Sequence, residues 1–349
     1  MSRSILRAGG GIHCYTLFLT MSGASSNDAV RRPNPDKPLR GYENGVAHGS
    51  EIEGGEILHQ GELLRSEKRL CLLAKPTLSG SMCIHHLNCA TMRPFAFVLS
   101  DTATLVSRAH LVVHCLLVET NDGLVLVDSG FGCADRTRPS RFERAFMALS
   151  NSSRDLAETA AHQVAGLGYA LEDVRHIVQT HLHLDHAGGL PDFPHAQIHL
   201  HALEHDAAMH PRTFSELFYL RAHWAHHPRW VLHTSQGQQW FGFDAIRVLK
   251  GVSPAIWLIH LPGHTRGHCA VAVETTSGWL LHCGDAYISR SDIDPAHTPR
   301  SRPGWIQPLA RRLFPHVPRL RALLRQHGDQ VQLFCAHDPF ELARYQTNT

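Results

Sequence analysis

The chain has 349 residues, of which 43% are hydrophobic and 18% charged, with a net charge of +2. This length allows one large or two ordinary domains, and the hydrophobic fraction suffices for a buried core. The sequence contains neither a dense lysine and arginine block to neutralise nucleic-acid phosphates nor a run of about 18 apolar residues to span a membrane. We therefore expect no nucleic-acid partner and no membrane partner.

Residues 1–81 differ in character from the rest of the chain. Segment 22–55 is rich in Gly, Pro, Asn, Ser and charged residues and has no apolar periodicity, which is typical of disorder. Met82 opens a stretch that resembles a natural protein start. We expect 1–81 to be a disordered extension, or to result from a start codon assigned upstream of Met82, and 82–349 to be the functional domain. Two arginines before a short, interrupted apolar stretch leave a secretory signal as the weaker alternative.

From residue 111 the sequence has the pattern of a mixed α/β domain. Leu111–Glu119 and Leu124–Asp128 are predicted strands joined by the hairpin signature Asn-Asp-Gly. Apolar residues at helical spacing predict a helix over Arg154–Leu167. Further strands are expected at Ile177, Ile198, Ile246, Ile256, Val271, Leu280 and Val331, with a helix near Arg319–His327. This mixture fits two sheets packed face to face with helices outside.

The nine cysteines are scattered along the chain and form no CxxC pair. Several lie in apolar strand patterns, where a free cysteine behaves as a small hydrophobic residue. This usage favours a reducing cytoplasm. Cys283 precedes Asp285 by two positions, and we expect it to be a buried strand residue rather than a side chain facing a metal.

The run Thr180–His186, with sequence THLHLDH, concentrates side chains that bind metals. Imidazole nitrogens and carboxylate oxygens are ligands for zinc, iron and manganese. His181 and His183 are two apart on an extended segment, so they point the same way. Asp185 and His186 follow where the chain bends toward a glycine pair. One loop can therefore supply half of each of two metal sites.

Three further candidate ligands follow downstream, each just past the end of an expected strand. His264 lies in the run PGHTRGH, Asp285 follows an apolar strand, and His337 ends the last strand. A sheet can present polar groups at such a rim without burying them unpaired. The chain holds 29 histidines, so single ones mean little. The ordered series HxHxDH, GH, GD and AHD is the informative signal.

These motifs resemble those of the metallo-β-lactamase superfamily, from about Met82 to about Ala343, and within it the acyl-homoserine-lactonase-like branch. The resemblance implies an α/β fold, the four-layer αββα sandwich, and two divalent ions, with zinc expected ahead of iron or manganese. It implies seven ligands: His181, His183 and His264 at one ion, Asp185, His186 and His337 at the other, and Asp285 with a hydroxide as the bridge.

The resemblance also implies catalytic residues. Asp185 is the expected source of a proton for the leaving group. Tyr287 is the candidate for a tyrosine that contacts the substrate carbonyl, but it follows Asp285 by two positions where the family pattern has three. Asp128 and His268 are candidates for orienting the metal-binding imidazoles, and Asp128 is equally suited to capping the turn that follows it.

The expected function is hydrolysis of a lactone, ester or similar acyl bond by hydroxide held between two metal ions. The expected partner is a small molecule with an acyl or lactone group, and a homodimer is left open. Alternatives on the same fold are a thioester hydrolase resembling glyoxalase II and a mononuclear iron oxygenase. A non-catalytic ligand-binding protein is a further alternative. A β-lactamase proper fits the PGHTRGH and AHD runs less well.

An aromatic-rich insertion separates the first motif from His264. It contains Phe214, Phe218, Tyr219, Trp224, Trp230, Trp240 and Phe241, with histidines and arginines between them. Two interpretations stay open. The insertion covers the cleft, which implies a substrate with an apolar part such as an acyl chain, or it packs as an ordinary excursion at the edge of the sandwich.

Overall fold

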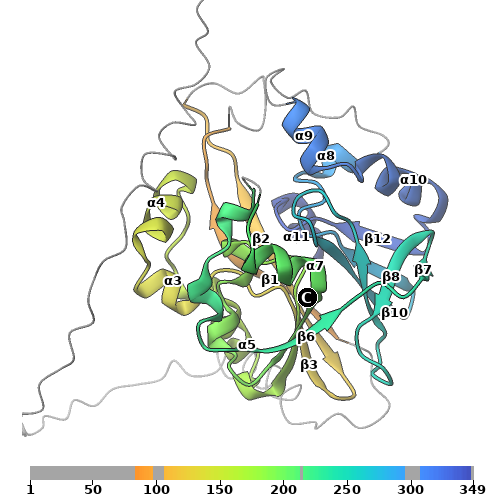
Figure 1. The fold of residues 1–349 in the computed structure, drawn as a ribbon, viewed down its shortest axis with the longest axis horizontal. Helices are drawn as coiled ribbons and strands as arrows, with labels where there is room; N and C mark the ends of the chain where they lie inside the picture. Colours follow the sequence, from red (N-terminus) through yellow and green to blue (C-terminus); the bar gives the residue numbers. More distant parts are fainter. Residues whose placement is uncertain (1–82, 97–105, 213–214, 295–306, 347–349) are drawn as a thin grey trace, which may run out of the picture. The chain divides into compact units, whose positions relative to one another are not determined.

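The computed structural model describes residues 83–96, 106–212, 215–294 and 307–346 (Figure 1). All of them belong to one compact unit, residues 64–349. The expectations for residues 1–81 lie outside the described residues. Within the described ranges, no helix has both the length and the apolar character needed to cross a membrane.

The first sheet has six strands in the order of the sequence, β1 to β6. Their bounds are β1 Ile84–Met92, β2 Leu111–Thr120, β3 Gly123–Val127, β4 Val174–Val178, β5 Gln197–His201 and β6 Arg229–His233. β1, β2 and β3 pair antiparallel, whereas β3 to β6 run parallel. Because parallel strands end at the same edge, the segments that follow β3, β4 and β5 meet there.

The second sheet also has six strands, in the order β12-β11-β10-β9-β8-β7. Their bounds are β7 Gln238–Trp240, β8 Phe243–Arg247, β9 Ile256–His260, β10 Cys269–Thr275, β11 Gly278–His282 and β12 Val331–Phe334. β11 and β12 are parallel, and the other neighbours are antiparallel. The loops after β9, β11 and β12 carry His264, Asp285 and His337.

Helices cover the outer face of each sheet. In Figure 1, α3 and α4 lie on the side of the first sheet, and α8 and α10 lie on the opposite side beside the second. The bounds are α3 Cys133–Thr137, α4 Arg141–Ser150, α5 Ala160–Gly166, α6 Leu184–Ala187, α7 Ala202–Met209, α8 Arg290–Ile293, α9 Gln307–Leu313, α10 Val317–His327 and α11 Pro339–Gln346. Short 3-10 turns connect them: η2 Leu156–Glu158, η3 Leu171–Asp173, η4 Leu190–Asp192, η5 Ser215–Phe218 and η6 Arg221–Trp224.

The apolar residues form three layers that follow the alternation of side chains along the strands. One cluster lies between the sheets and includes Val127 and Val178 of the first sheet and Leu258 and Val271 of the second. A second cluster backs the first sheet, and a third backs the second sheet. Two sheets with helices on both outer faces confirm the predicted αββα sandwich.

The strand predictions are confirmed, but the helix predicted over Arg154–Leu167 is wrong in its first half. The chain there forms the 3-10 turn η2, and α5 begins only at Ala160. The Thr159 side chain accepts a hydrogen bond from the amide of His162, so it caps a new helix instead of continuing an old one. Local capping therefore overrides the apolar spacing.

Histidines occupy part of the layer between the sheets. His176 of β4, His199 of β5 and His233 of β6 are linked by ring-nitrogen hydrogen bonds of 3.0 Å each. On the same face of β5, His201 stacks on His260 of β9, with ring centroids 4.2 Å apart. The two sheets therefore meet through imidazoles here, and a second group of rings, His114, His282 and Phe334, lies between them as well.

Candidate metal centre

The HxHxDH run begins where β4 ends at the open edge of the first sheet. His183 is the N-cap residue of the one-turn helix α6, so the chain turns directly after it. His181 and His183 therefore lie on extended backbone. Asp185 and His186 lie on the helical backbone of α6. The two pairs therefore face neighbouring points.

His181, His183 and His264 form the first trio. One ligand atom from each lies within 4.8 Å of the others. Nε2 of His264 lies 3.0 Å from Nδ1 of His183. Each of these ring nitrogens can carry the lone pair that binds a metal. Three imidazole nitrogens that converge at this spacing suit one divalent ion.

Asp185, His186 and His337 form the second trio, again with ligand atoms within 4.8 Å of one another. Oδ2 of Asp185 lies 3.8 Å from Nε2 of His186 and 3.7 Å from Nε2 of His337. This mixture of two imidazoles and one carboxylate also suits a divalent ion.

Asp285 lies between the two trios. Its Oδ2 is 3.1 Å from Nε2 of His264 and 4.0 Å from Nε2 of His181. Its Oδ1 is 3.1 Å from Nε2 of His337 and 3.4 Å from Nε2 of His186. Oδ2 also lies 3.3 Å from Nε2 of His337. The carboxylate therefore lies within reach of the ligand atoms of both trios, as a bridging ligand would.

The hydrogen bonds assign the ring nitrogens of three of these histidines. Nδ1 of His181 faces the hydroxyl oxygen of Thr180, Nδ1 of His186 faces the Asp128 carboxylate, and Nδ1 of His337 faces a backbone carbonyl. Each of these Nδ1 atoms donates its proton, so each Nε2 turns a lone pair toward the centre.

Nε2 of His181 and Nε2 of His186 are buried and have no hydrogen-bond partner. A buried nitrogen without a partner is unfavourable unless something else satisfies it. Burial also lowers the pKa of His181 and of His183 well below the usual range, which keeps their rings unprotonated. Neutral imidazole is the form that binds a metal. The residues present therefore fit two divalent ions.

Asp128 and His268 support the centre in different ways. Asp128 accepts from Nδ1 of His186 at 2.9 Å and from the amide and hydroxyl of Thr180, so it orients an imidazole as expected. His268 donates from Nδ1 to a carbonyl and accepts at Nε2 from the amide of Asp285 at 3.0 Å. It therefore holds the backbone of Asp285 and not an imidazole.

Tyr287 does not face the centre. Its side chain is fully buried in the core behind the second sheet, and its hydroxyl donates to both carboxylate oxygens of Glu341, at 3.0 and 3.2 Å. The expected contact with a substrate carbonyl finds no support in this geometry. Cys283 is also buried in this core, as expected.

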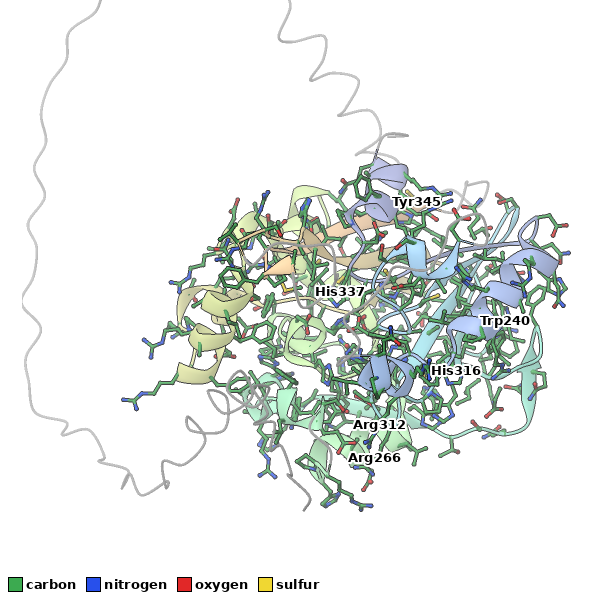
Figure 2. All side chains as sticks on the ribbon, turned by 90° about the horizontal axis from the view of Figure 1, so that it is seen from above. Trp240, Arg266, Arg312, His316, His337 and Tyr345 are labelled. Atoms are coloured by element: carbon green, nitrogen blue, oxygen red, sulfur yellow. The ribbon has the colours of Figure 1, made fainter. Side chains whose placement is uncertain are left out.

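A cavity of about 890 Å³ opens beside the trios. His183, Asp185, His264 and Asp285 line its floor, and its walls include the apolar side chains Phe146, Leu184, Phe218, Leu309 and Leu313. Arg266 and Arg312 also line it and lie at the same edge of the molecule in Figure 2. The cavity therefore combines an apolar wall with a polar floor.

The aromatic insertion is not a single unit. Phe218 lines the cavity, and Tyr219 packs beside His183 with ring centroids 5.4 Å apart. Trp224 and Trp230 pack into the core behind the first sheet, and Trp240 and Phe241 into the core behind the second. Figure 2 shows Trp240 away from His337. Phe214 lies outside the described residues. The first part of the insertion therefore borders the site, and the rest is ordinary packing.

Comparison with known proteins agrees with this geometry. The sequence profile of the Metallo-beta-lactamase superfamily matches residues 109–316. The chain belongs to the metallo-β-lactamase superfamily. A relative in this superfamily, a probable metallo-hydrolase of Mycobacterium tuberculosis, is 41% identical over 268 residues, which cover 75% of this chain and 82% of the relative. An N-acyl homoserine lactonase of a Bacillus species is 28% identical over 200 residues, or 56% of this chain and 72% of that protein.

Solved structures of the superfamily share the fold. A crystal structure of a Bacillus thuringiensis AiiA mutant with N-decanoyl-L-homoserine bound at its active site has a TM-score of 0.57 and 21% identity. The match covers 76% of this chain and 96% of that one. The likeness to the lactonase-like branch that the motifs indicate is thus confirmed.

Several contacts that shape the site were not foreseen, although Tyr219 was named as part of the aromatic insertion. Glu204 and Tyr219 lie directly behind the first trio, and a buried cluster of Asp135, Glu143 and His223 ties the insertion to α3 and α4. An isolated glutamate in a helix has no sequence signature. Only the packing of α7 against the two ligand loops reveals Glu204.

Proposed function

We propose that this chain is a metal-dependent hydrolase that cleaves a lactone, ester or related acyl bond with two divalent ions, zinc being the expected metal. The observation that carries the proposal is the placement of the Asp285 carboxylate between the two trios, 3.1 Å from His264 on one side and 3.1 Å from His337 on the other. His181, His183 and His264 would hold one ion, and Asp185, His186 and His337 the other. Two such ions lower the pKa of water and polarise a carbonyl group.

The protein itself would orient the substrate and supply a proton. The apolar wall of the cavity, with Phe146 and Phe218, suits an acyl chain, and the polar floor suits the carbonyl end. Asp185 lines the cavity and would pass a proton to the leaving alkoxide. The names of the relatives, a metallo-hydrolase and N-acyl homoserine lactonases, support this substrate class.

We also propose that residues 82–349 are the catalytic domain, because β1 begins at Ile84 and completes the first sheet. The family match over residues 109–316 falls within this range. The seven cysteines of the described residues are free thiols, which supports a reducing compartment such as the cytoplasm.

Metal content tests the proposal. We predict about two divalent ions per chain, as the two trios require, and loss of at least one ion and of turnover in Asp285→Ala and His264→Ala. Elemental analysis and a panel of lactones, esters and thioesters are the measurements. His195→Ala is the matched control, because His195 is exposed and belongs to neither trio. A fully active wild-type protein with a single stable ion would contradict the dinuclear assignment.

A further inference from the structure

Glu204 is a fully buried carboxylate in the first turn of α7, outside the seven expected ligands. Its Oε1 accepts from the amide of Leu182 at 2.9 Å and from the hydroxyl of Tyr219 at 2.7 Å. Its Oε2 accepts from the hydroxyl of Thr265 at 2.6 Å and from the amide of Gly267 at 3.2 Å. Four donors satisfy both oxygens, as burial of an ionised group requires.

Three of these four donors are next to a member of the first trio, and Gly267 follows His264 by three residues. Leu182 stands between His181 and His183, and Thr265 follows His264. Tyr219 forms an isolated antiparallel bridge with His183. Glu204 therefore bonds to every segment that supplies a ligand of the first trio.

Backbone packing supports the same arrangement. A Cβ atom added to Gly267 would lie 2.0 Å from the amide nitrogen of Glu204, closer than any side chain tolerates. The glycine in the run PGHTRGH therefore lets the loop after His264 rest directly on the start of α7. This contact brings the two ligand loops within reach of a single carboxylate.

The second trio has separate supports. Nδ1 of His186 is held by Asp128, and Nδ1 of His337 donates to the carbonyl of Val112 at 2.8 Å. Neither contact involves Glu204. Asp128 thus contacts the second trio directly and reaches the first only through the Thr180 hydroxyl that faces Nδ1 of His181, whereas Glu204 bonds only to segments of the first trio.

We propose that Glu204 is a positioning residue that assembles the first trio and thereby sets the metal affinity of that position and not of the other. The inference rests on the dinuclear centre proposed above. Groups that orient metal ligands typically change metal affinity about 10- to 100-fold when they are replaced.

The test uses the full chain with Glu204→Gln, and with Asp128→Asn as the matched variant for the second trio. Glutamine keeps one accepting oxygen for two of the four donors. Its amide NH₂ group would face the other two donors, with which it cannot form the same hydrogen bonds. Cadmium NMR resolves the two positions, which His264→Ala and His337→Ala assign, and titration with a chelator ranks their affinities. In Glu204→Gln, we expect the cadmium resonance of the first trio to disappear at a chelator concentration roughly 10- to 100-fold lower than in wild type. The resonance of the second trio should disappear at the same concentration as in wild type. Asp128→Asn should weaken the second position more than the first, because Asp128 bonds to His186 directly and reaches His181 only through Thr180.

Unfolding of the metal-free proteins separates positioning from general destabilisation. If Glu204→Gln does not fold, Thr265→Val and Tyr219→Phe each remove one donor and should weaken the same position selectively. Equal loss at both positions, or no loss at either, overturns the role of Glu204. A wild-type protein that binds fewer than two cadmium ions instead overturns the dinuclear centre itself.

Discussion

Asp185 differs from the other acidic residue of the centre in its exposure. Both side chains line the cavity, but Asp185 is 13% exposed and Asp285 only 6%. One oxygen of Asp185 faces His186 and His337, which leaves the other free to face a substrate. A carboxyl group so placed can hold a metal and also pass a proton to a leaving group.

These two roles of Asp185 predict different results for Asp185→Asn. If the residue passes a proton, the metal-loaded variant stays slow on alkoxide esters by roughly a hundredfold or more. Its defect is smaller on nitrophenolate esters, because that leaving group needs no proton. We expect this outcome, measured as kcat at saturating metal.

A ligand role alone would give another pattern. The defect would then be the same for both classes of ester and would disappear when metal is added in excess. Asp122→Asn is a suitable control, because Asp122 is an exposed aspartate between β2 and β3 that pairs with Arg175 and does not line the cavity.

The residues of the centre could be predicted because their types and spacing carry the chemistry. The structure brings together all seven side chains that the motifs indicate. The direction of a single side chain could not be predicted. Tyr287 follows Asp285 by two positions, and this spacing turns its ring into the core toward Glu341.

Among the elements, η6 is fastened to α3 and α4 by a buried ionic cluster. Nε2 of His223 lies 3.1 Å from Asp135 and 3.2 Å from Glu143. Burial by itself would lower the pKa of His223, but the two carboxylates outweigh it and raise the pKa to about 9. The imidazolium therefore holds the cavity side of the insertion to the helices beside it.

This raised pKa gives a pH-dependent prediction. The stabilisation is complete below the unfolded pKa of about 6.5 and is lost as pH rises through about 9. His223→Gln should lower the free energy of unfolding by about 1–3 kcal/mol near neutral pH, and this difference should shrink above about pH 9. Urea unfolding across this range measures it.

His210→Gln is the matched control for this prediction. His210 pairs with Asp206 at 3.0 Å, but its side chain is 68% exposed, and such surface pairs contribute little. A difference between wild type and His223→Gln that stays constant between about pH 7 and pH 10 would show that folding does not raise the pKa of His223.

Most elements could be read from periodicity, and the exceptions have local causes. β1 begins two residues after Met82, where we expected no strand. It pairs with β2 from Ile84↔Val118 to Met92↔Leu111. The ends of α5 depend on the Thr159 cap, which apolar spacing does not register. Strand runs of five to ten residues carry a stronger signal than such caps.

At the scale of the whole molecule, the two sheets meet partly through histidines. No sequence pattern predicts the row of His176, His199 and His233, because its members come from three strands far apart in the chain. Burial, together with His176 and His233, lowers the pKa of His199 to about 3. Burial likewise lowers the pKa of His201 to about 4, with His260 adding to the effect. The interior of the sandwich is therefore built to hold neutral imidazoles.

This arrangement predicts that acid weakens the sandwich. A lowered folded pKa gives stability that is complete above the unfolded pKa of about 6.5 and is lost as pH falls toward about 3. At about pH 5 the unfolded chain gains roughly 2 kcal/mol from protonating His199 alone. In His199→Gln, the side-chain amide can replace the ring contacts with His176 and His233. Between about pH 7.5 and pH 5, the free energy of unfolding of this variant should therefore fall by about 2 kcal/mol less than that of wild type. Urea unfolding of metal-free protein excludes acid release of metal as the cause, and exposed His195→Gln is the control. Parallel stability curves for wild type and His199→Gln would mean that His199 is not held neutral between the sheets.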